Sequence, residues 1–394
     1  MSEREQGFTT RAVSAWKRIA GSLASRPASP PLYQAATFIF DDMDHFAAMA
    51  QSKTEGGYLY TRWGNPTTDA VASVIASLEG AEATACFASG MAAITAAVTS
   101  LVTSGDHIVS ASQLYGGTHG LFADIMPRIG VDVTLADVTD HDAIRKAFTA
   151  RTRVLYCETI GNPTMAVADL RALVAIAHEH DAMVVVDSTF TPPYILRPLE
   201  HGVDLVVHSA TKYLGGHSDV TAGVVSGAAA PVAHLRHLSL DTGGTLAPFE
   251  AWLLGRGIQT LALRMDRICS SALALATFLE SHPAVLRVAY PGLASHPHHD
   301  LARALLGDRF GGVIAFEVAD AAAGRRLMER VKVAAPAASL GGTKTLIVHP
   351  ASVTHTQLTR EERESVGVAD GLIRLSVGIE DVEDLIADLD EALS

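Results

Sequence analysis

The chain has 394 residues, of which 48% are hydrophobic and 19% are charged, so it can bury a substantial core and is long enough for more than one domain. Its formal net charge of −13 argues against a protein that binds nucleic-acid phosphates. No apolar stretch is long enough for a membrane span, and the first residues lack the apolar core of a signal peptide. We therefore expect a cytoplasmic protein that has neither nucleic acid nor a membrane as a partner.

Three parts are predicted along the chain. Residues 1–63 show little periodic pattern and carry the proline-rich run Arg26-Pro27-Ala28-Ser29-Pro30-Pro31, so we expect an extended N-terminal arm that lies on a partner subunit. Within residues 64–258, apolar strands alternate with helical segments, which predicts a mostly parallel, three-layer α/β domain. Residues 259–394 begin with a long helical segment and continue as a smaller α+β domain.

A turn at Ser89-Gly90 separates a short predicted strand from a helix that begins at Met91. The free N–H groups and the positive dipole end of such a helix suit a phosphate, and Gly90 lets the backbone approach closely. An ordinary helix N-cap is the alternative, because Ser-Gly turns before helices are common. On the first interpretation, Ser89, Gly90 and Met91 hold a cofactor phosphate.

The apolar run Ala182–Phe190 has the pattern of a strand that is buried on both faces, and Asp187 stands where the strand is predicted to end. A carboxylate at this edge of a parallel sheet faces the ligand crevice. In a pyridoxal phosphate site an acid must keep the pyridine nitrogen protonated, and Asp187 could do so. A helix cap or a turn residue is the alternative.

A second apolar run leads through Ser209 and Thr211 to Lys212, and a glycine pair follows shortly after. The pattern is typical of a Schiff-base lysine, whose amine becomes a nucleophile only where burial or a cationic neighbour removes its proton. A solvent-exposed lysine at a strand end is the alternative. Asp187 and Lys212 lie about one βαβ unit apart and could bind the two poles of pyridoxal phosphate, with Ser209 and Thr211 as hydroxyl donors to its phosphate.

Neither a metal site nor a disulfide framework is predicted. The three cysteines, Cys86, Cys157 and Cys269, are far apart in the sequence and form no Cys-x-x-Cys pattern. The run from His296 to Asp300 is rich in histidine, but it has no helical i, i+4 pair and no third ligand. We expect a solvent-facing loop there.

Several longer stretches make the chain resemble the γ-family of fold-type I pyridoxal phosphate enzymes of cysteine and methionine metabolism, and the methionine γ-lyases most of all. The resemblance begins near Thr9 and continues to the C-terminus. Its most specific stretches are Tyr58–Thr67, Ala88–Met91, Leu114–Gly117, Asp187–Pro192, Val206–Gly216, Ser339–Gly342 and His349–His355. The resemblance implies a homotetramer, built as a dimer of tight dimers, with active sites shared between subunits.

The resemblance also implies roles around the cofactor. Tyr60 and Arg62 reach the cofactor phosphate of the neighbouring subunit, and Tyr115 stacks on the pyridine ring and acts as an acid or base at the substrate. Glu158 and Asn162 lie near the ring oxygen of the cofactor. Taken without the resemblance, Tyr60 and Arg62 belong to a surface turn, and Tyr115 is a loop anchor.

Two residues are assigned to the substrate by the same resemblance. Arg374 binds the α-carboxylate, which suits a planar guanidinium, and Ser339 assists through its backbone or its hydroxyl. The alternation of Leu372, Arg374 and Ser376 places these three on one face of a predicted strand. An arginine that is ion-paired on an edge strand is the alternative.

The implied activity is that of a carbon–sulfur lyase in which Lys212, Tyr115 and Asp187 are catalytic. Such an enzyme performs α,γ-elimination on L-methionine or a related thioether amino acid and releases 2-oxobutanoate, ammonia and a thiol. A non-catalytic alternative, a pyridoxal-binding regulatory protein, needs a DNA-binding region, and the arm before Asn65 is too short and too weakly basic to supply one.

The chain departs from the methionine γ-lyases around the substrate. They have cysteine where this chain has Gly116, and a Lys-Asp pair where it has Ser239 and Leu240, so the pocket for the thioether end is more open and less charged. A γ-replacement enzyme, such as an O-acylhomoserine sulfhydrylase or a cystathionine γ-synthase/lyase, is therefore the alternative activity. Lys344 stands where cystathionine enzymes usually have glutamate, which favours the sulfhydrylase among these.

Overall fold

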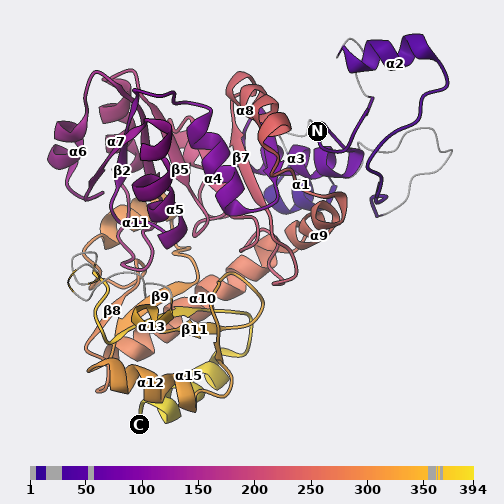
Figure 1. The fold of residues 1–394 in the computed structure, drawn as a ribbon. Coiled ribbons are helices and arrows are strands. Elements are labelled where there is room, and N and C mark those ends of the chain that lie inside the picture. Colours follow the sequence, from indigo (N-terminus) through magenta and orange to yellow (C-terminus); the bar gives the residue numbers. More distant parts are fainter. Residues whose placement is uncertain (1–5, 15–28, 52–56, 354–360, 362, 364–366) are drawn as a thin grey trace.

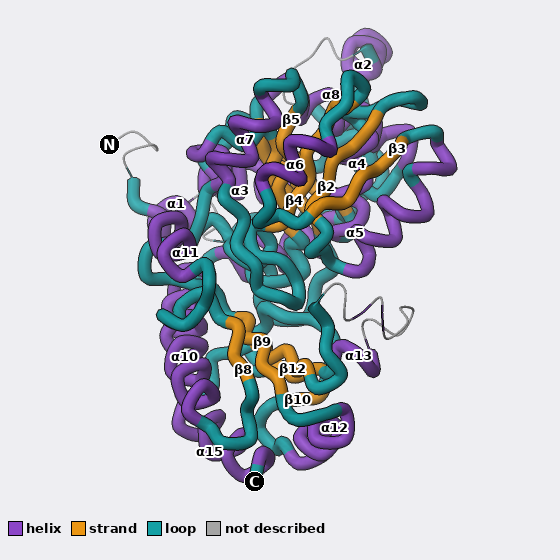
Figure 2. Tube along the Cα trace, turned by 90° about the vertical axis from the view of Figure 1, so that its left-hand side faces the viewer, coloured by secondary structure: helices purple, strands orange, loops and turns teal. Residues whose placement is uncertain are grey.

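The computed structural model describes residues 6–14, 29–51, 57–353, 361, 363 and 367–394. It contains a seven-stranded and a five-stranded sheet, each packed against helices (Figures 1 and 2). The strands of the larger sheet all fall within residues 64–258 and those of the smaller sheet within residues 259–394. The domain boundaries themselves stay a prediction. Among the described residues, no helix has both the length and the apolar character needed to cross a membrane.

The larger sheet has the strand order β1-β7-β6-β5-β4-β2-β3, and within it β7 runs opposite to the other strands. Strands β4, β5 and β6 are buried almost throughout, because helices cover both faces of the sheet, and this explains their uninterrupted apolar sequences. The predicted fold class, a mostly parallel α/β sheet with a second, smaller α+β part, is confirmed. The strands are β1 (Ala83–Phe87), β2 (His107–Ala111), β3 (Asp132–Ala136), β4 (Thr152–Glu158), β5 (Met183–Asp187), β6 (Leu205–His208) and β7 (Gly223–Gly227).

Polar residues start several helices around this sheet. Asn65 accepts a hydrogen bond from the N–H of Thr67 at 2.9 Å and so caps α3, and Ser89 caps α4 in the same way through the N–H of Ala92 at 3.1 Å. The helices are α3 (Pro66–Glu79), α4 (Gly90–Thr99), α5 (Gly116–Gly120), α6 (His141–Ala147), α7 (Leu170–His178), α8 (Ala229–Thr242) and α9 (Pro248–Ile258).

The described part of the predicted N-terminal arm contains two short helices. Helix α1 (Phe8–Ser14) packs on α3, where Arg11 donates a hydrogen bond to the carbonyl oxygen of Ser77. Helix α2 (Met43–Ala50) projects away from the rest of the chain (Figure 1). Of the proline-rich run, residues 26–28 lie outside the described residues.

The smaller sheet has the order β10-β11-β12-β9-β8 and places β12 at its centre. The long helix α10 runs from the larger part of the molecule to this sheet, where α12 and α15 also pack (Figure 2). The strands are β8 (Arg287–Ala289), β9 (Val313–Glu317), β10 (Ala335–Pro336), β11 (Leu346–Val348) and β12 (Leu372–Ser376), and the helices are α10 (Leu261–Ser281), α11 (His299–Leu306), α12 (Ala321–Arg330), α13 (Pro350–Val353) and α15 (Val382–Leu393).

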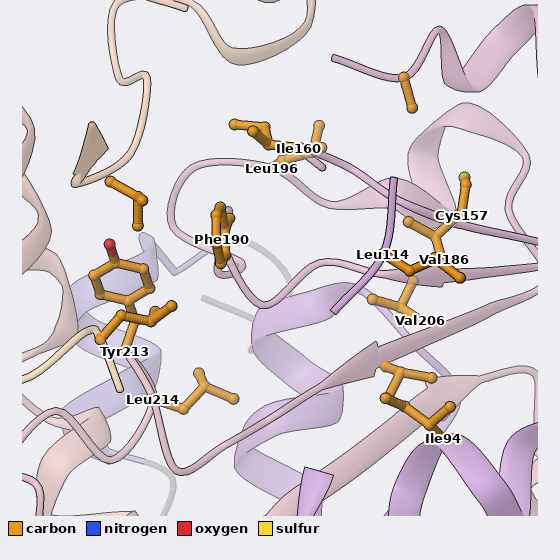
Figure 3. Close-up of a cluster of buried hydrophobic side chains, with 14 of the residues drawn as sticks. Ile94, Leu114, Cys157, Ile160, Val186, Phe190, Leu196, Val206, Tyr213 and Leu214 are labelled. Carbon is orange, nitrogen blue, oxygen red and sulfur yellow. The ribbon is translucent and has the colours of Figure 1, made fainter. Parts of the chain in front are cut away.

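Buried apolar side chains connect the large sheet to the loop that follows β6. Figure 3 shows Val186 of β5 and Val206 of β6 in this cluster, together with Tyr213 and Leu214. Tyr213 and Leu214 are each 1% exposed, and they directly follow Lys212. Burial of two large side chains next to Lys212 stabilises the loop, so the lysine backbone is held against the sheet rather than in solvent.

Candidate active site

Lys212 lies in the turn after β6, where its N–H donates to the carbonyl oxygen of Ser209 at 3.0 Å. Its Nζ atom donates to Oγ of Ser339 at 2.7 Å. Burial, and then repulsion from Arg374, lowers the pKa of the Lys212 ammonium to about 8. About a tenth of this amine is therefore unprotonated at pH 7, far more than for a lysine in water. Lys212 is partly buried and has a cationic neighbour, as expected.

Arg374 lies in the middle of β12 and is 6% exposed. Its Nη2 atom donates to the carbonyl oxygen of Ser339 at 3.0 Å, and its Nη1 atom donates to Oδ1 of Asn162 at 3.2 Å. Burial lowers the pKa of the guanidinium to about 10, so it stays positive at neutral pH. Its Nε atom has no hydrogen-bond partner among the described residues, and the side chain forms no ion pair there. A carboxylate from outside the chain could supply both the hydrogen-bond acceptor and the negative charge.

Two carboxylates end neighbouring strands. Glu158 of β4 is the register partner of Asp187 of β5, and both side chains are buried. Burial, and then repulsion from Asp187, raises the pKa of Glu158 well above its usual value, and burial also raises the pKa of Asp187. Glu158 accepts hydrogen bonds from the N–H groups of Tyr115 at 2.6 Å and Asn162 at 3.3 Å, whereas Asp187 accepts one from the N–H of Thr189 at 2.8 Å. Asp187 is thus the carboxylate with capacity for a further donor.

The start of α4 forms the predicted phosphate end of the site. The Ser89 hydroxyl is used by the N–H of Ala92, so the N–H groups of Gly90 and Met91 at the tip of the helix remain for an external acceptor. A Cβ atom on Gly90 would lie 2.7 Å from Oγ of Ser209, so only glycine allows this hydroxyl to lie against the helix start. The tip of α4 and Ser209 therefore share one side of the site.

Thr211 lies on the same loop but its hydroxyl is already engaged. Oγ1 of Thr211 donates to the carbonyl oxygen of Ala222 at 3.1 Å and accepts from the N–H of Ala222 at 2.9 Å. The N–H of Ser209 in turn donates to Oγ1 of Thr189 at 2.8 Å. Ser209 is thus better placed than Thr211 to offer a hydroxyl proton to a phosphate.

Tyr115 precedes α5 and is 51% exposed. Its ring lies over Gly117, because a Cβ atom on that glycine would be 2.6 Å from Cε1 of the tyrosine and 3.0 Å from Sδ of Met91. Glu158 holds the backbone N–H of Tyr115. The ring therefore lies beside Met91 at the start of α4, and about half of the residue remains exposed.

Tyr60 and Arg62 are separate from this network. Arg62 donates to the carbonyl oxygen of Leu240, and its guanidinium lies 5.7 Å from the ring centre of Tyr60. Both are exposed, and no contact described for this chain joins either of them to Lys212. Leu240 and its neighbour Ser239 line a small surface pocket together with Arg62, so these segments form one surface.

Three features of the site region were not predicted. Thr189 connects Asp187 to Ser209, and Ser339 adopts a φ of 106°, a backbone conformation that no sequence pattern indicated. Glu79 and His208 form a buried pair behind the site. The position of His208 at the end of an apolar strand could have indicated that this histidine is buried.

The expectation of a solvent-facing histidine loop is wrong. His296 is 6% exposed, and Nδ1 of His298 accepts a hydrogen bond from the N–H of Val167 at 3.1 Å, because this run packs on the loop that carries Asn162. Within the described ranges, no three potential ligand residues form a metal site, and no metal was predicted.

These residues fit pyridoxal phosphate. An amine of lowered pKa, a tip of α4 that can accept a phosphate and a buried carboxylate with capacity for a cationic nitrogen surround one region. The guanidinium of Arg374, which donates to the carbonyl oxygen of Ser339, has an Nε–H group with no partner among the described residues. Each group is what one end of that cofactor or an amino-acid substrate requires.

Comparison with known proteins agrees with this assignment. The family model for Cys/Met metabolism PLP-dependent enzymes matches residues 10–394. The L-methionine gamma-lyase of Fusobacterium nucleatum is 44% identical, with 100% of this chain and 99% of that protein covered, and that of Pseudomonas putida is 45% identical, with 100% and 98% covered. A Campylobacter jejuni structure described as an O-acetylhomoserine (thiol)-lyase has a TM-score of 0.93 at 32% identity, covers 98% of this chain and 100% of its own, and carries a pyridoxyl phosphate group on a lysine. Because a pyridoxal phosphate site and full-length relatives coincide, the chain belongs to the Cys/Met metabolism family of PLP-dependent enzymes.

Proposed function

We propose that this chain is a carbon–sulfur lyase that performs α,γ-elimination on L-methionine or a related thioether amino acid, with 2-oxobutanoate, ammonia and a thiol as products. The observation that carries the proposal is the bridge from Lys212 through Ser339 to Arg374. It places the amine of Lys212 beside a guanidinium that has no ion-pair partner among the described residues. The amino group of an α-amino acid would then lie near the lysine and its carboxylate near the arginine. The relatives named L-methionine gamma-lyase support the choice of reaction.

The residues that would hold the cofactor divide by the part they bind. Lys212 would bind the aldehyde end of the cofactor, Asp187 the pyridine nitrogen and Tyr115 the face of the ring, while Glu158 and Asn162 would lie near the ring oxygen. The N–H groups of Gly90 and Met91, at the tip of α4 that Ser89 caps, and the hydroxyl of Ser209 would bind the phosphate, while Thr211 would hold the loop through Ala222. When bound, pyridoxal phosphate supplies an electron sink for a carbanion at the substrate Cα.

The chain's own residues then hold the substrate and move its protons. Arg374 fixes the α-carboxylate through its free guanidinium donor, with Ser339 beside it. Nζ of Lys212, which has a pKa of about 8, is basic enough to take the proton from Cα. Loss of a second proton, from Cβ, provides the electron pair that expels the thiolate from Cγ, and Tyr115, which is half exposed, protonates this thiolate. Burial of Lys212 and Arg374 keeps water away from the carbon that reacts.

Tyr60 and Arg62 act at the site of a neighbouring subunit in this proposal. Both are exposed on a surface that includes the Leu240 carbonyl. A guanidinium there suits a phosphate. The assembly we propose is a homotetramer made of two tight dimers, in which each site takes these two residues from its partner.

The substrate is tested by incubating the purified protein with L-methionine alone. We expect 2-oxobutanoate and a volatile thiol without any added acceptor. The Lys212→Ala variant is the control and should show neither product nor the visible absorbance of a lysine-bound cofactor. Failure of the wild-type protein to form 2-oxobutanoate from any thioether amino acid would exclude the lyase.

A γ-replacement enzyme, such as an O-acylhomoserine sulfhydrylase or a cystathionine γ-synthase/lyase, is the second candidate. The specific observation in its favour is that two uncharged residues, Ser239 and Leu240, line the small surface pocket that Arg62 also lines. The Campylobacter structure described as an O-acetylhomoserine (thiol)-lyase supports it. Activity that depends on an acylated homoserine together with sulfide, and that is absent with methionine alone, would select this candidate.

A further inference from the structure

Glu79 and His208 form a buried polar pair that the proposed reaction does not use. Oε1 of Glu79 lies 2.5 Å from Nε2 of His208, and the side chains are 0% and 2% exposed. Oε2 of Glu79 has no hydrogen-bond partner among the described residues. An isolated charge is very costly in such a place, so the two side chains either share one proton as a neutral pair or form an ion pair.

The pair lies directly behind the cofactor end of the sheet. Glu79 ends α3 and His208 ends β6, one residue before Ser209. Val207 is the register partner of Asp187, and side chains alternate along a strand. His208 therefore points to the opposite face of the sheet, toward α3, while its backbone adjoins the strand that carries Asp187.

We propose that Glu79 and His208 form a buried ion pair whose imidazolium keeps Asp187 ionised, so that both are positioning residues for the cofactor chemistry. The inference rests on the proposed function in one respect, because it takes Asp187 as the partner of the pyridine nitrogen. Glu79 stabilises the positive ring, and the ring acts on Asp187 across the thickness of the sheet.

The groups around Asp187 indicate why His208 would be the residue that keeps this carboxylate ionised. The titratable groups of β4 that interact electrostatically with Asp187 are Glu158, Tyr156 and Cys157, and none of them is a cation. Burial raises the pKa of Asp187, hydrogen bonds from Thr189 oppose that effect, and a positive charge on His208 would oppose it further. Among the described residues near Asp187, His208 is the basic one.

The charge state of the pair is measured first, in wild-type holoenzyme labelled with ¹⁵N-histidine. Solid-state NMR should show both ring nitrogens of His208 protonated, with the signal assigned by its loss in His208→Gln. In Glu79→Gln, which keeps the size and the hydrogen bond but removes the negative charge, the ring should be neutral. Once the signal is assigned, a neutral His208 in the wild-type enzyme would overturn the inference whether or not Glu79→Gln folds.

The effect on Asp187 is measured by the pH dependence of the visible absorbance of the bound cofactor. In Glu79→Gln, loss of the imidazolium makes Asp187 easier to protonate and the pyridine nitrogen easier to deprotonate. A neutral ring withdraws fewer electrons, so the nitrogen that joins Lys212 to the cofactor keeps its proton to higher pH. We expect the midpoint to rise by about one pH unit, a tenfold change in proton concentration.

Thr84→Val is the matched control, because it removes another buried hydrogen bond, the 2.7 Å contact of Thr84 with Ser226, without changing a charge. It should lower the melting temperature and leave the midpoint unchanged. An unchanged midpoint in Glu79→Gln at full cofactor loading would overturn this inference and leave the proposed function standing. Absence of a lysine-bound cofactor spectrum in the wild-type protein would instead refute the proposed site.

Discussion

Lys212, which is partly buried, and Arg374, which is buried, share one serine as a hydrogen-bond partner. Oγ of Ser339 accepts from Nζ of Lys212 at 2.7 Å, and the carbonyl oxygen of the same residue accepts from Nη2 of Arg374 at 3.0 Å. Each positive charge therefore disfavours the other, and repulsion from Arg374 is the second cause of the lowered pKa of Lys212 after burial. A bound substrate carboxylate would cancel that repulsion.

The rate at which the apoenzyme takes up pyridoxal phosphate should increase with pH and level off above the Lys212 pKa of about 8, because only the unprotonated amine attacks. Stopped-flow visible absorbance measures this rate. In Arg374→Gln the midpoint should move to higher pH, since the lysine loses its cationic neighbour. A rate that does not vary with pH across this range would contradict the assignment of Lys212.

Arg374→Lys should raise KM for the amino-acid substrate about 10- to 100-fold, because a lysine cannot form the two parallel charged hydrogen bonds of a guanidinium. The absorbance of the bound cofactor should persist, since Arg374 is not assigned to it. Steady-state kinetics and a cofactor spectrum measure the two effects. Arg287→Lys, which alters a surface ion pair with Glu317, is the control and should change neither. Equal KM values in the two variants would remove Arg374 from its role.

Gly216→Ala should destabilise the protein and release the cofactor. Gly216 has a φ of 71°, and a Cβ atom there would overlap the guanidinium of Arg264, which donates to the carbonyl oxygen of Tyr213 at 2.8 Å. The substitution therefore adds a clash next to Lys212 to a backbone strain of about 1–2 kcal/mol. Gly307→Ala is the control, with a φ of 66° and no atom within 4 Å of the added Cβ. Equal melting temperatures and equal cofactor retention in both variants would show that the Arg264 contact does not matter.

Local patterns predicted the elements that bury an apolar face. The sequence of β5 is an unbroken apolar run, so this strand was predicted and is confirmed. Helix α7, which has a clear apolar stripe, is one of the helical segments expected within residues 64–258. Helices α1 and α2 were not predicted, because the residues buried in them are Ala12 and Met49 alone. A helix that buries so little leaves almost no periodic signal.

Sequence patterns alone could propose a site residue only where a local signal, such as the end of an apolar run, marks its position. Lys212 and Asp187 each end an apolar run, whereas the resemblance to a family was needed for Arg374, whose strand pattern alone also suited a surface ion pair. Glu79 and His208 are 129 positions apart, and no local rule indicates that they meet. His296 was placed in solvent because its packing partner is likewise distant in the sequence.

Active sites shared between subunits should allow two inactive variants to restore each other. Lys212→Ala removes the amine of a subunit's own site, and Arg62→Ala removes the guanidinium that we propose it lends to its partner. In a mixed dimer, one of the two sites has Lys212 from one subunit and Arg62 from the other and is intact. Random reassembly of equal amounts makes about half of the dimers mixed, so about a quarter of the wild-type activity should return. Mixing Lys212→Ala with Arg374→Met is the matched control, because both residues belong to the same subunit's site and no intact site can form. Equal residual activity in the two mixtures, with hybrid dimers verified by native mass spectrometry, would rule out a shared site.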